Sequence, residues 1–191
     1  MSTRRGGPAR HNGWRSAIAV LALVLLPCAA SARPLDDQER AALAATVASF
    51  GAAMREDNFA RVTETVPPKV IGAIARRAGT TPDRIVALMI KAMQTLQRGD
   101  TKIVSFGMDL ASADHKELAS GGPYVLIPTE TIVAAGGQRF RERSHTLALL
   151  DEGKWFLLRI SNARQIEILR EVYPEFARVE FPSGSTEALD P

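Results

Sequence analysis

The stretch from Gln138 to Asn162 constrains the fold of this chain more than any other part of the sequence. Two β-prone runs flank the short segment Asp151–Lys154, whose Gly153 can adopt a left-handed conformation, and a three- or four-residue hairpin loop is built in this way. The first run covers 13 residues, about 43 Å at ~3.3 Å per residue. A strand of this length in a small domain must curl strongly, usually at a bulge. The stretch therefore predicts a strongly curved antiparallel hairpin.

The first 32 residues have the pattern of an export signal. Residues 1–15 contain four arginines and no acidic residue, and the apolar run Ala17–Leu26 follows them. Ala30-Ser31-Ala32 then supplies the small residues that a signal peptidase reads. We predict a Sec-type signal peptide in residues 1–32, cleaved after Ala32, and a periplasmic or secreted mature protein. The apolar run is about half the ~20 residues of a membrane-spanning helix. We therefore expect no stable membrane insertion after cleavage, with a retained anchor as the alternative.

The predicted mature chain has a nearly balanced charge. Four of the 24 Lys and Arg residues lie in residues 1–32, which leaves 20 against 21 Asp and Glu residues. A nucleic-acid partner, which needs a basic patch or stripe, is not expected. Cys28 is the sole cysteine and lies in the signal segment, so disulfides are excluded from the mature chain. Acylation of Cys28 is a disfavoured alternative, because Pro27 stands where a small residue is required.

Helical periodicity fills residues 36–98, ahead of the hairpin. Apolar residues recur there at three- and four-residue spacing in four segments, each polar on its other side. Pro68 and Pro82 suit first helical turns, and Thr81 is a capping residue in front of the last segment. Four amphipathic helices are predicted, and their apolar sides must pack on elements that come later in the chain.

Alternating apolar and polar residues follow Gly99. They predict strands over 101–110 and 124–133, and Pro128 requires an open side or a bulge in the second of these. With the hairpin strands, the order is helices first and then a curled antiparallel meander, which is typical of an α+β half-barrel with a four-stranded sheet. We assign residues 33–182 to a single α+β domain and residues 183–191 to a flexible C-terminal tail.

Three segments together resemble a known superfamily. They are Phe50–Phe59 in the helical part, the strand Tyr124–Glu130, and the turn Asp151–Trp155, in which Lys-Trp opens the last strand. The chain resembles the nuclear transport factor 2-like superfamily, the cone-shaped fold of ketosteroid isomerases and SnoaL-like proteins, and in particular its exported bacterial members of unestablished function. The resemblance implies N-terminal helices packed on a strongly curved four-stranded sheet. It implies little about activity, because this scaffold hosts enzymes, binding modules and assembly domains.

One face of the first hairpin strand is basic. Arg139, Arg141, Arg143 and His145 have the same parity and so share a face. We interpret this row as a solvated outer face that discourages pairing with other chains. A mouth that accepts an anion is the alternative.

The opposite parity offers a candidate cavity. Phe140 and Glu142, with Tyr124 and Glu130 on the neighbouring strand, would line the concave side of a cone. Two carboxylates in a dry pocket would have raised proton affinity, but a cross-strand Glu–Arg surface pair is the more common outcome. Tyr124 and Trp155 start their strands near a rim, where aromatic residues serve as ligand walls, interface anchors or plain core.

Catalytic candidates are restricted to Asp109, Glu130 and His145. A ketosteroid-isomerase mechanism needs an Asp base facing a Tyr and a protonated Asp, and Asp109 is the acid that could serve as that base. His115 and His145 lack metal-ligand spacing, so no metal and no cofactor are expected.

We therefore expect an exported protein that binds a small apolar ligand or a protein partner, with no evident catalytic role. An isomerase- or hydrolase-type enzyme with acidic residues in the cone is one alternative. A self-association module that forms a homodimer through its sheet is another. Two titratable side chains converging in an apolar cavity would favour the enzyme, and a cavity filled by Leu, Met and Phe would oppose it.

Overall fold

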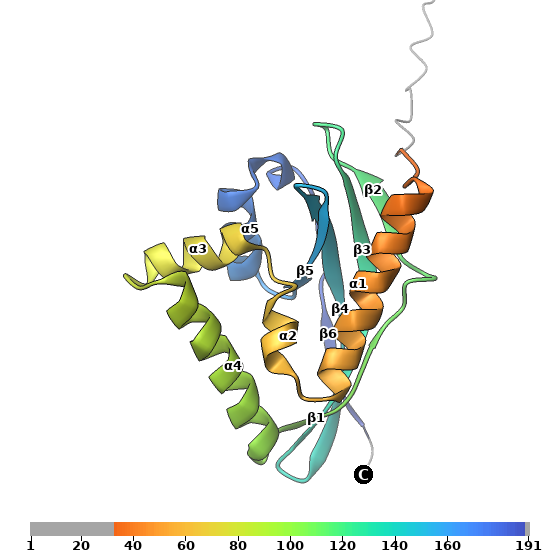
Figure 1. Ribbon diagram of the computed structural model, residues 1–191. Coiled ribbons are helices and arrows are strands. Elements are labelled where there is room, and N and C mark those ends of the chain that lie inside the picture. The colour runs from red at the N-terminus through yellow and green to blue at the C-terminus, as the bar shows by residue number, and fades with distance from the viewer. Residues whose placement is uncertain (1–32, 190–191) are drawn as a thin grey trace, which may run out of the picture. The chain divides into compact units, whose positions relative to one another are not determined.

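Four N-terminal helices open the computed structural model, which describes residues 33–189 (Figure 1). They are α1 (Asp37–Arg55), α2 (Phe59–Thr63), α3 (Pro68–Arg77) and α4 (Pro82–Arg98). Local chemistry sets their starts, because the side chains of Asp36, Asn58 and Thr81 each accept a hydrogen bond from a backbone N–H in the first turn. No helix within the described residues is long and apolar enough to cross a membrane. The predicted signal peptide lies outside these residues.

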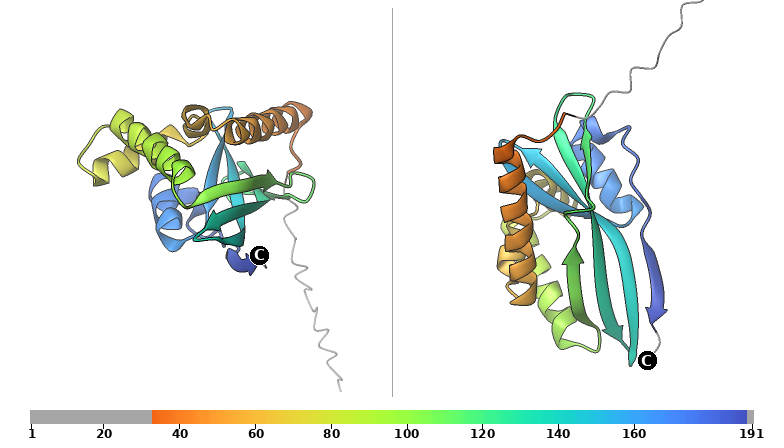
Figure 2. Two further views of the ribbon diagram at one scale, coloured as in Figure 1. Left: turned by 90° about the horizontal axis from the view of Figure 1, so that it is seen from below. Right: turned by 90° about the vertical axis from the view of Figure 1, so that its right-hand side faces the viewer.

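An antiparallel sheet follows the helices. Its strands are β1 (Lys102–Met108), β2 (Asp114–Glu117), β3 (Pro123–Ala135), β4 (Gln138–Asp151), β5 (Lys154–Ile160) and β6 (Ser185–Leu189). The order β1-β3-β4-β5 forms the main path, and it curls over the helices (Figure 2). The predicted α+β class, with helices on a curled four-stranded antiparallel sheet that forms a half-barrel, is confirmed.

The two long central strands change partners at mid-length. On the outer edge of β3, β2 pairs with residues 123–126 and β1 with residues 129–134. On the outer edge of β4, β6 pairs with residues 139–143 and β5 with residues 145–151. Both changes fall at one level, where Pro128 lies opposite His145. Pro128 has no N–H to donate, and its carbonyl accepts from the Asp109 N–H at 2.9 Å.

The curl arises without a bulge between the central strands. The register of β3 and β4 is continuous from Tyr124↔Leu149 to Ala135↔Gln138, whereas the shift in this part of the sheet lies in β1, between Ile103 and Ser105. The long hairpin strand therefore has no bulge in its ladder with β3, contrary to our prediction. Instead, its outer partner changes from β6 to β5 at mid-length. Gly153, at φ 77°, forms the predicted turn between β4 and β5.

Alternation along the strands separates two faces of the sheet. The helix face packs on α1, and its core residues are Leu43, Val125, Ile127, Ala148, Trp155 and Leu157. The opposite face, here called the pocket face, packs near Gly153 on α5 (Ala163–Val172) and the 3-10 helix η1 (Pro174–Phe176). Figure 2 shows α1 and α5 on opposite sides of the sheet. The arginine row of β4 is on the pocket face. Beyond His145 the residues on this face are the buried Leu147 and Leu149.

The C-terminal segment differs from the prediction. We expected residues 183–191 to be a flexible tail, but Ser185–Leu189 form β6 on the edge of β4. Glu187 contacts Arg141 and Arg143, and Gly184 lies so close to β4 that a Cβ there would be 3.1 Å from the Arg143 carbonyl oxygen. The sequence of β6 has no apolar alternation, so its pairing depends on residues far away in the chain.

Candidate functional site

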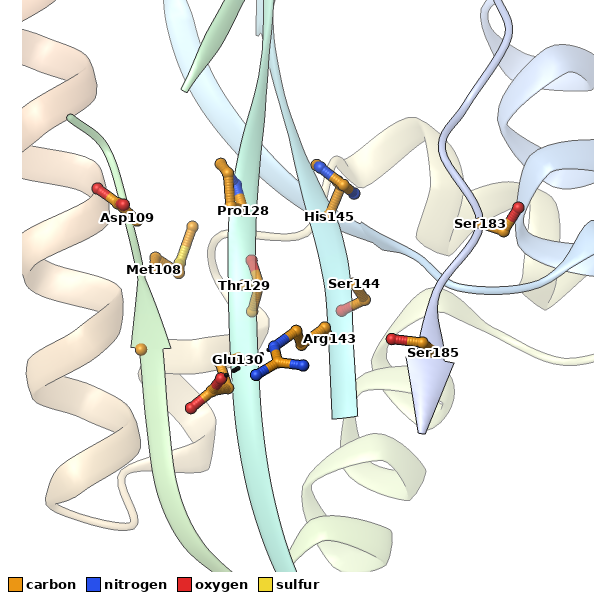
Figure 3. A pocket seen from close by; sticks show the side chains of 11 residues that line it. Met108, Asp109, Pro128, Thr129, Glu130, Arg143, Ser144, His145, Ser183 and Ser185 are labelled. Atoms are coloured by element: carbon orange, nitrogen blue, oxygen red, sulfur yellow. Dashed lines mark ion pairs between the residues drawn. The ribbon is translucent and has the colours of Figure 1, made fainter. Parts of the chain in front are cut away.

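A pocket of about 600 Å³ lies on the pocket face at the level where the flanking strands change. Its walls come from Gly107–Asp109 at the end of β1, Pro128–Glu130 of β3, Arg143–His145 of β4, and Ser183 and Ser185 at the entry to β6 (Figure 3). The pocket exists because β1 ends at this level and β6 begins here, while α5 and η1 cover the half of the face near Gly153. We call it the Pro128 pocket.

The three catalytic candidates Asp109, Glu130 and His145 all line the Pro128 pocket. Glu130 and His145 come from β3 and β4, and Asp109 directly follows β1. The structure therefore brings together the titratable residues that we named, although the pocket is on the face opposite to α1.

His145 contributes an unsatisfied polar atom to the pocket. Its Nδ1 is buried and has no hydrogen-bond partner among the described residues. The cross-strand neighbours of His145 are Pro128 and Ile160, and neither side chain can hydrogen-bond. Leaving a buried donor or acceptor unpaired costs about 1–3 kcal/mol, and the Oγ of the neighbouring Ser144 is buried and unpaired as well.

Glu130 is held by two arginines. Its Oε2 lies 3.3 Å from the Nε atoms of both Arg141 and Arg143. The same two guanidinium groups contact Glu187 of β6 at 2.7 and 3.2 Å, and the hydrogen bond from Arg141 lowers the pKa of Glu187. The cross-strand Glu–Arg pair expected for Glu130 is confirmed. Because two carboxylates occupy the two guanidinium groups, the anion-accepting alternative has no support here.

Asp109 is occupied by its own turn. Its carboxylate accepts hydrogen bonds from the backbone N–H groups of Ala111 and Ser112, each at 3.1 Å. Hydrogen bonds from Ser112, through side chain and backbone, lower the pKa of Asp109. A lowered pKa makes this carboxylate a weaker proton acceptor, whereas the proposed base would need a pKa nearer the operating pH. Asp109 therefore acts here as a turn-forming carboxylate at the pocket wall.

Glu142 and Phe140 do not share a cavity with Glu130. The cross-strand partner of Glu142 is Thr131, so Glu142 projects to the helix face and Glu130 to the pocket face. Glu142 forms an ion pair with Arg159 of β5. The hypothesis of a paired-carboxylate site is therefore wrong, because the register places the two acids on opposite sides of the sheet.

Tyr124 and Trp155 belong to the core. Tyr124 is 5% exposed and packs edge-on against Phe176 at a centroid distance of 5.3 Å. Trp155 is 2% exposed, and its Nε1 donates to the Glu39 carbonyl at 2.9 Å. Core packing, one of the three interpretations that we left open, holds for both. Trp155 also borders a separate hollow of about 310 Å³ beside α1, but neither residue lines the Pro128 pocket.

Sequence reasoning missed the residues that complete the pocket. Gly107, Ser183 and Ser185 line it, and no motif marks them. Pro128 carried a signal, since a proline inside a strand pattern indicates a break in pairing. No group of His, Cys, Asp and Glu side chains within residues 33–189 could hold a metal ion.

Comparisons of the chain with protein-family models, with curated proteins and with solved structures gave no match. The resemblance to the nuclear transport factor 2-like superfamily therefore stays a prediction from the sequence.

Proposed function

We propose that this chain is a binding protein for a small, mainly apolar and uncharged ligand, with the Pro128 pocket as its site. The pocket volume of about 600 Å³ falls within the range of about 300–1,000 Å³ typical of small-molecule sites. Carbon atoms make up most of its lining surface, including those of the Pro128 ring. Such a surface favours an apolar body.

The observation that carries this proposal is the unpaired Nδ1 of His145. A ligand with one hydroxyl, amide or carbonyl group would satisfy this nitrogen once the imidazole turns to bring Nδ1 to the pocket surface, and this contact would fix the ligand's orientation. The charged residues of the pocket do not require a charged ligand as a partner, because Glu130 is paired with arginines and Asp109 accepts hydrogen bonds from backbone N–H groups. A neutral ligand therefore fits better than an ionic one.

The enzymatic alternative finds less support. Acid–base work by a carboxyl group needs raised proton affinity, whereas the pKa of Asp109 is lowered and Glu130 lies between two arginines. The helix face beneath α1 contains Leu43, Phe50 and Met108, the apolar filling that opposes a catalytic cone.

Titration with Nile red, a neutral dye whose emission shifts in apolar surroundings, tests this function. We expect saturable 1:1 binding that Gly107→Trp weakens at least tenfold. A Cβ at Gly107 would meet nothing within 4 Å, and its φ is not positive, so the indole can fill the pocket without backbone strain. Lys102→Trp adds the same group to an exposed position on β1 and serves as the control.

A second pair of variants tests the role of His145. His145→Phe keeps a ring of similar size and removes Nδ1, so affinity for a ligand with a carbonyl group, such as Nile red, should fall about tenfold, equivalent to ~1.4 kcal/mol. His115→Phe on β2 is the matched control, because His115 is exposed and lies outside the pocket.

Equal affinity of the Gly107→Trp and Lys102→Trp proteins would overturn the proposal.

A further inference from the structure

The edge of β4 from Arg139 to Arg143 is occupied by a lightly held strand. β6 has five residues, of which four are exposed and one is half-buried. It pairs with β4 through the ladder from Arg139↔Leu189 to Arg143↔Ser185. Little apolar surface is buried with it, so hydrogen bonds and ion pairs supply most of its attachment.

This edge contacts two chemical features of the C-terminal segment, one in β6 and one directly before it. Glu187 lies between Arg141 and Arg143, with its oxygens 2.7 and 3.2 Å from their Nη1 atoms. Three residues earlier, Gly184 approaches the Arg143 carbonyl oxygen so closely that a Cβ would be 3.1 Å away. The edge therefore accepts an extended segment with a glycine and, three positions on, a carboxylate.

The chain before β6 is anchored up to Phe181. The ring of Phe181 stacks on Phe176 at a centroid distance of 6.2 Å, and the Val179 carbonyl accepts from Arg170 at 2.9 Å. Only Pro182, Ser183 and Gly184 separate this anchor from β6. β6 can leave the edge by rotation at these three residues, while the core beneath Phe176 stays packed.

We propose that the Arg139–Arg143 edge is a strand-addition site for a second copy of this chain, and that two copies exchange β6 reciprocally. A second copy carries the glycine and the carboxylate at the required spacing, and exchange re-forms the same bonds, which makes it a low-cost route to a dimer. Short hinges favour such exchange. The chain's own strand competes at an effective concentration on the order of millimolar, so the dimer forms at high protein concentration.

Exchange would also alter the Pro128 pocket. Ser183 and Ser185 line it, so each pocket of the dimer would be completed by the other copy. The strand site itself does not depend on ligand binding, and a failure of the Nile red titration would leave it intact.

A charge-swapped pair of proteins tests the exchange. Arg141→Glu places an acid on the edge, and Glu187→Lys places a base on the strand, so each protein alone has a mismatched edge and strand. In an equimolar mixture each strand finds a matching edge on the other protein. We expect light scattering to give the monomer mass for each protein alone and twice that mass for the mixture.

The matched control replaces Glu187→Lys by Glu180→Lys. Glu180 is exposed and lies outside the β4–β6 ladder. Both mixtures are measured at a protein concentration at which the wild type alone is monomeric, so the mixture of the Glu180→Lys and Arg141→Glu proteins should stay monomeric. Monomers in the charge-swapped mixture, with circular dichroism showing both proteins folded, would overturn the proposal. Dimers in the Glu180→Lys mixture would also overturn it.

A peptide measurement covers the case in which Arg141→Glu prevents folding. A fluorescent peptide with the sequence of residues 182–189 should bind the Glu187→Lys protein at least tenfold more tightly than the wild type, because its own strand vacates the edge. The same peptide with Val at the position of Gly184 should not bind. Equal binding of both peptides would contradict strand addition.

Discussion

Strands β5 and β6 pair with the same edge of β4 but are held there differently. β5 follows β4 through the turn at Gly153 and buries Trp155, Phe156 and Leu157. β6 arrives from the C-terminal segment, is mostly exposed, and places Glu187 against arginines of β4. Buried apolar surface contributes about 25 cal/mol per Å², whereas exposed ion pairs contribute little. One half of this edge is therefore part of the core, and the other half is exchangeable.

The largest expected effect is on the β5 side. Trp155→Ala removes a buried ring and its hydrogen bond to Glu39, so the free energy of unfolding should fall by about 3–5 kcal/mol. Urea denaturation followed by circular dichroism measures this loss. Val104→Ala, at a side chain that is 50% exposed, should change stability by less than ~0.5 kcal/mol. Similar losses in the two variants would show that β5 is not held by its core contacts.

The end of β4 beside the β5 turn should make stability depend on pH. Asp151 accepts from Tyr173 at 2.8 Å and from Lys69 at 2.7 Å. Burial alone would raise the pKa of Asp151, but the hydrogen bonds from Lys69 and Tyr173 outweigh it and lower the pKa. Burial, followed by the hydrogen bond to Asp151, raises the pKa of Tyr173.

The signs of these shifts set two pH limits. A lowered carboxyl pKa contributes stability above its unfolded value near ~3.9, and this is lost as pH falls further. A raised tyrosine pKa contributes stability below its unfolded value near ~10, and this is lost as pH rises further. Asp151→Asn should cost about 1–2 kcal/mol at pH 7 and remove the loss of stability at the acidic end. At the alkaline end it should only reduce the loss, because burial still raises the pKa of Tyr173. An unchanged profile measured by thermal melting would contradict this role.

The smallest effect on global stability is expected on the β6 side. Glu187→Gln should leave the melting temperature nearly unchanged but raise hydrogen exchange at the backbone amides of residues 139–143. Glu142→Gln is the matched control, because Glu142 lies in the same stretch of β4 but its ion-pair partner, Arg159, belongs to β5 and not to β6. If Glu142→Gln raised hydrogen exchange at residues 139–143 as much as Glu187→Gln does, the ion pairs of β6 would not be what holds this half of the β4 edge.

Added salt should reproduce the Glu187→Gln effect in the wild-type protein. The Debye length falls from about 10 Å at 0.1 M to about 3 Å at 1 M ionic strength, so the exposed ion pairs of Glu187 weaken. Lowering the pH acts in the same direction, since the lowered pKa of Glu187 means that its contribution is lost on protonation. The protection of the β5 amides relative to their intrinsic exchange rates should stay unchanged in both cases.

Three of the candidate residues named from the sequence lie together in the structure, although not on the face that we expected. Asp109, Glu130 and His145 were chosen as titratable residues on different strands, and all three line one pocket. Phe140, Glu142, Tyr124 and Trp155 were expected at a cavity, but the first two project to the helix face and the last two belong to the core. Parity tells which residues share a face of one strand, but the register between strands decides which residues meet.

Local patterns in the sequence determined the helices, their caps and the hairpin of residues 138–162, because turn glycines, capping side chains and apolar periodicity act over a few residues. Only the tertiary structure decided where the flanking strands change partners and which segment occupies the edge of β4. Glu187 meets Arg141 across 46 positions of the chain, and the ladder is made by backbone groups that every residue except proline carries. No local pattern encodes such a contact, so β6 and the pocket beside it appear only in the folded chain.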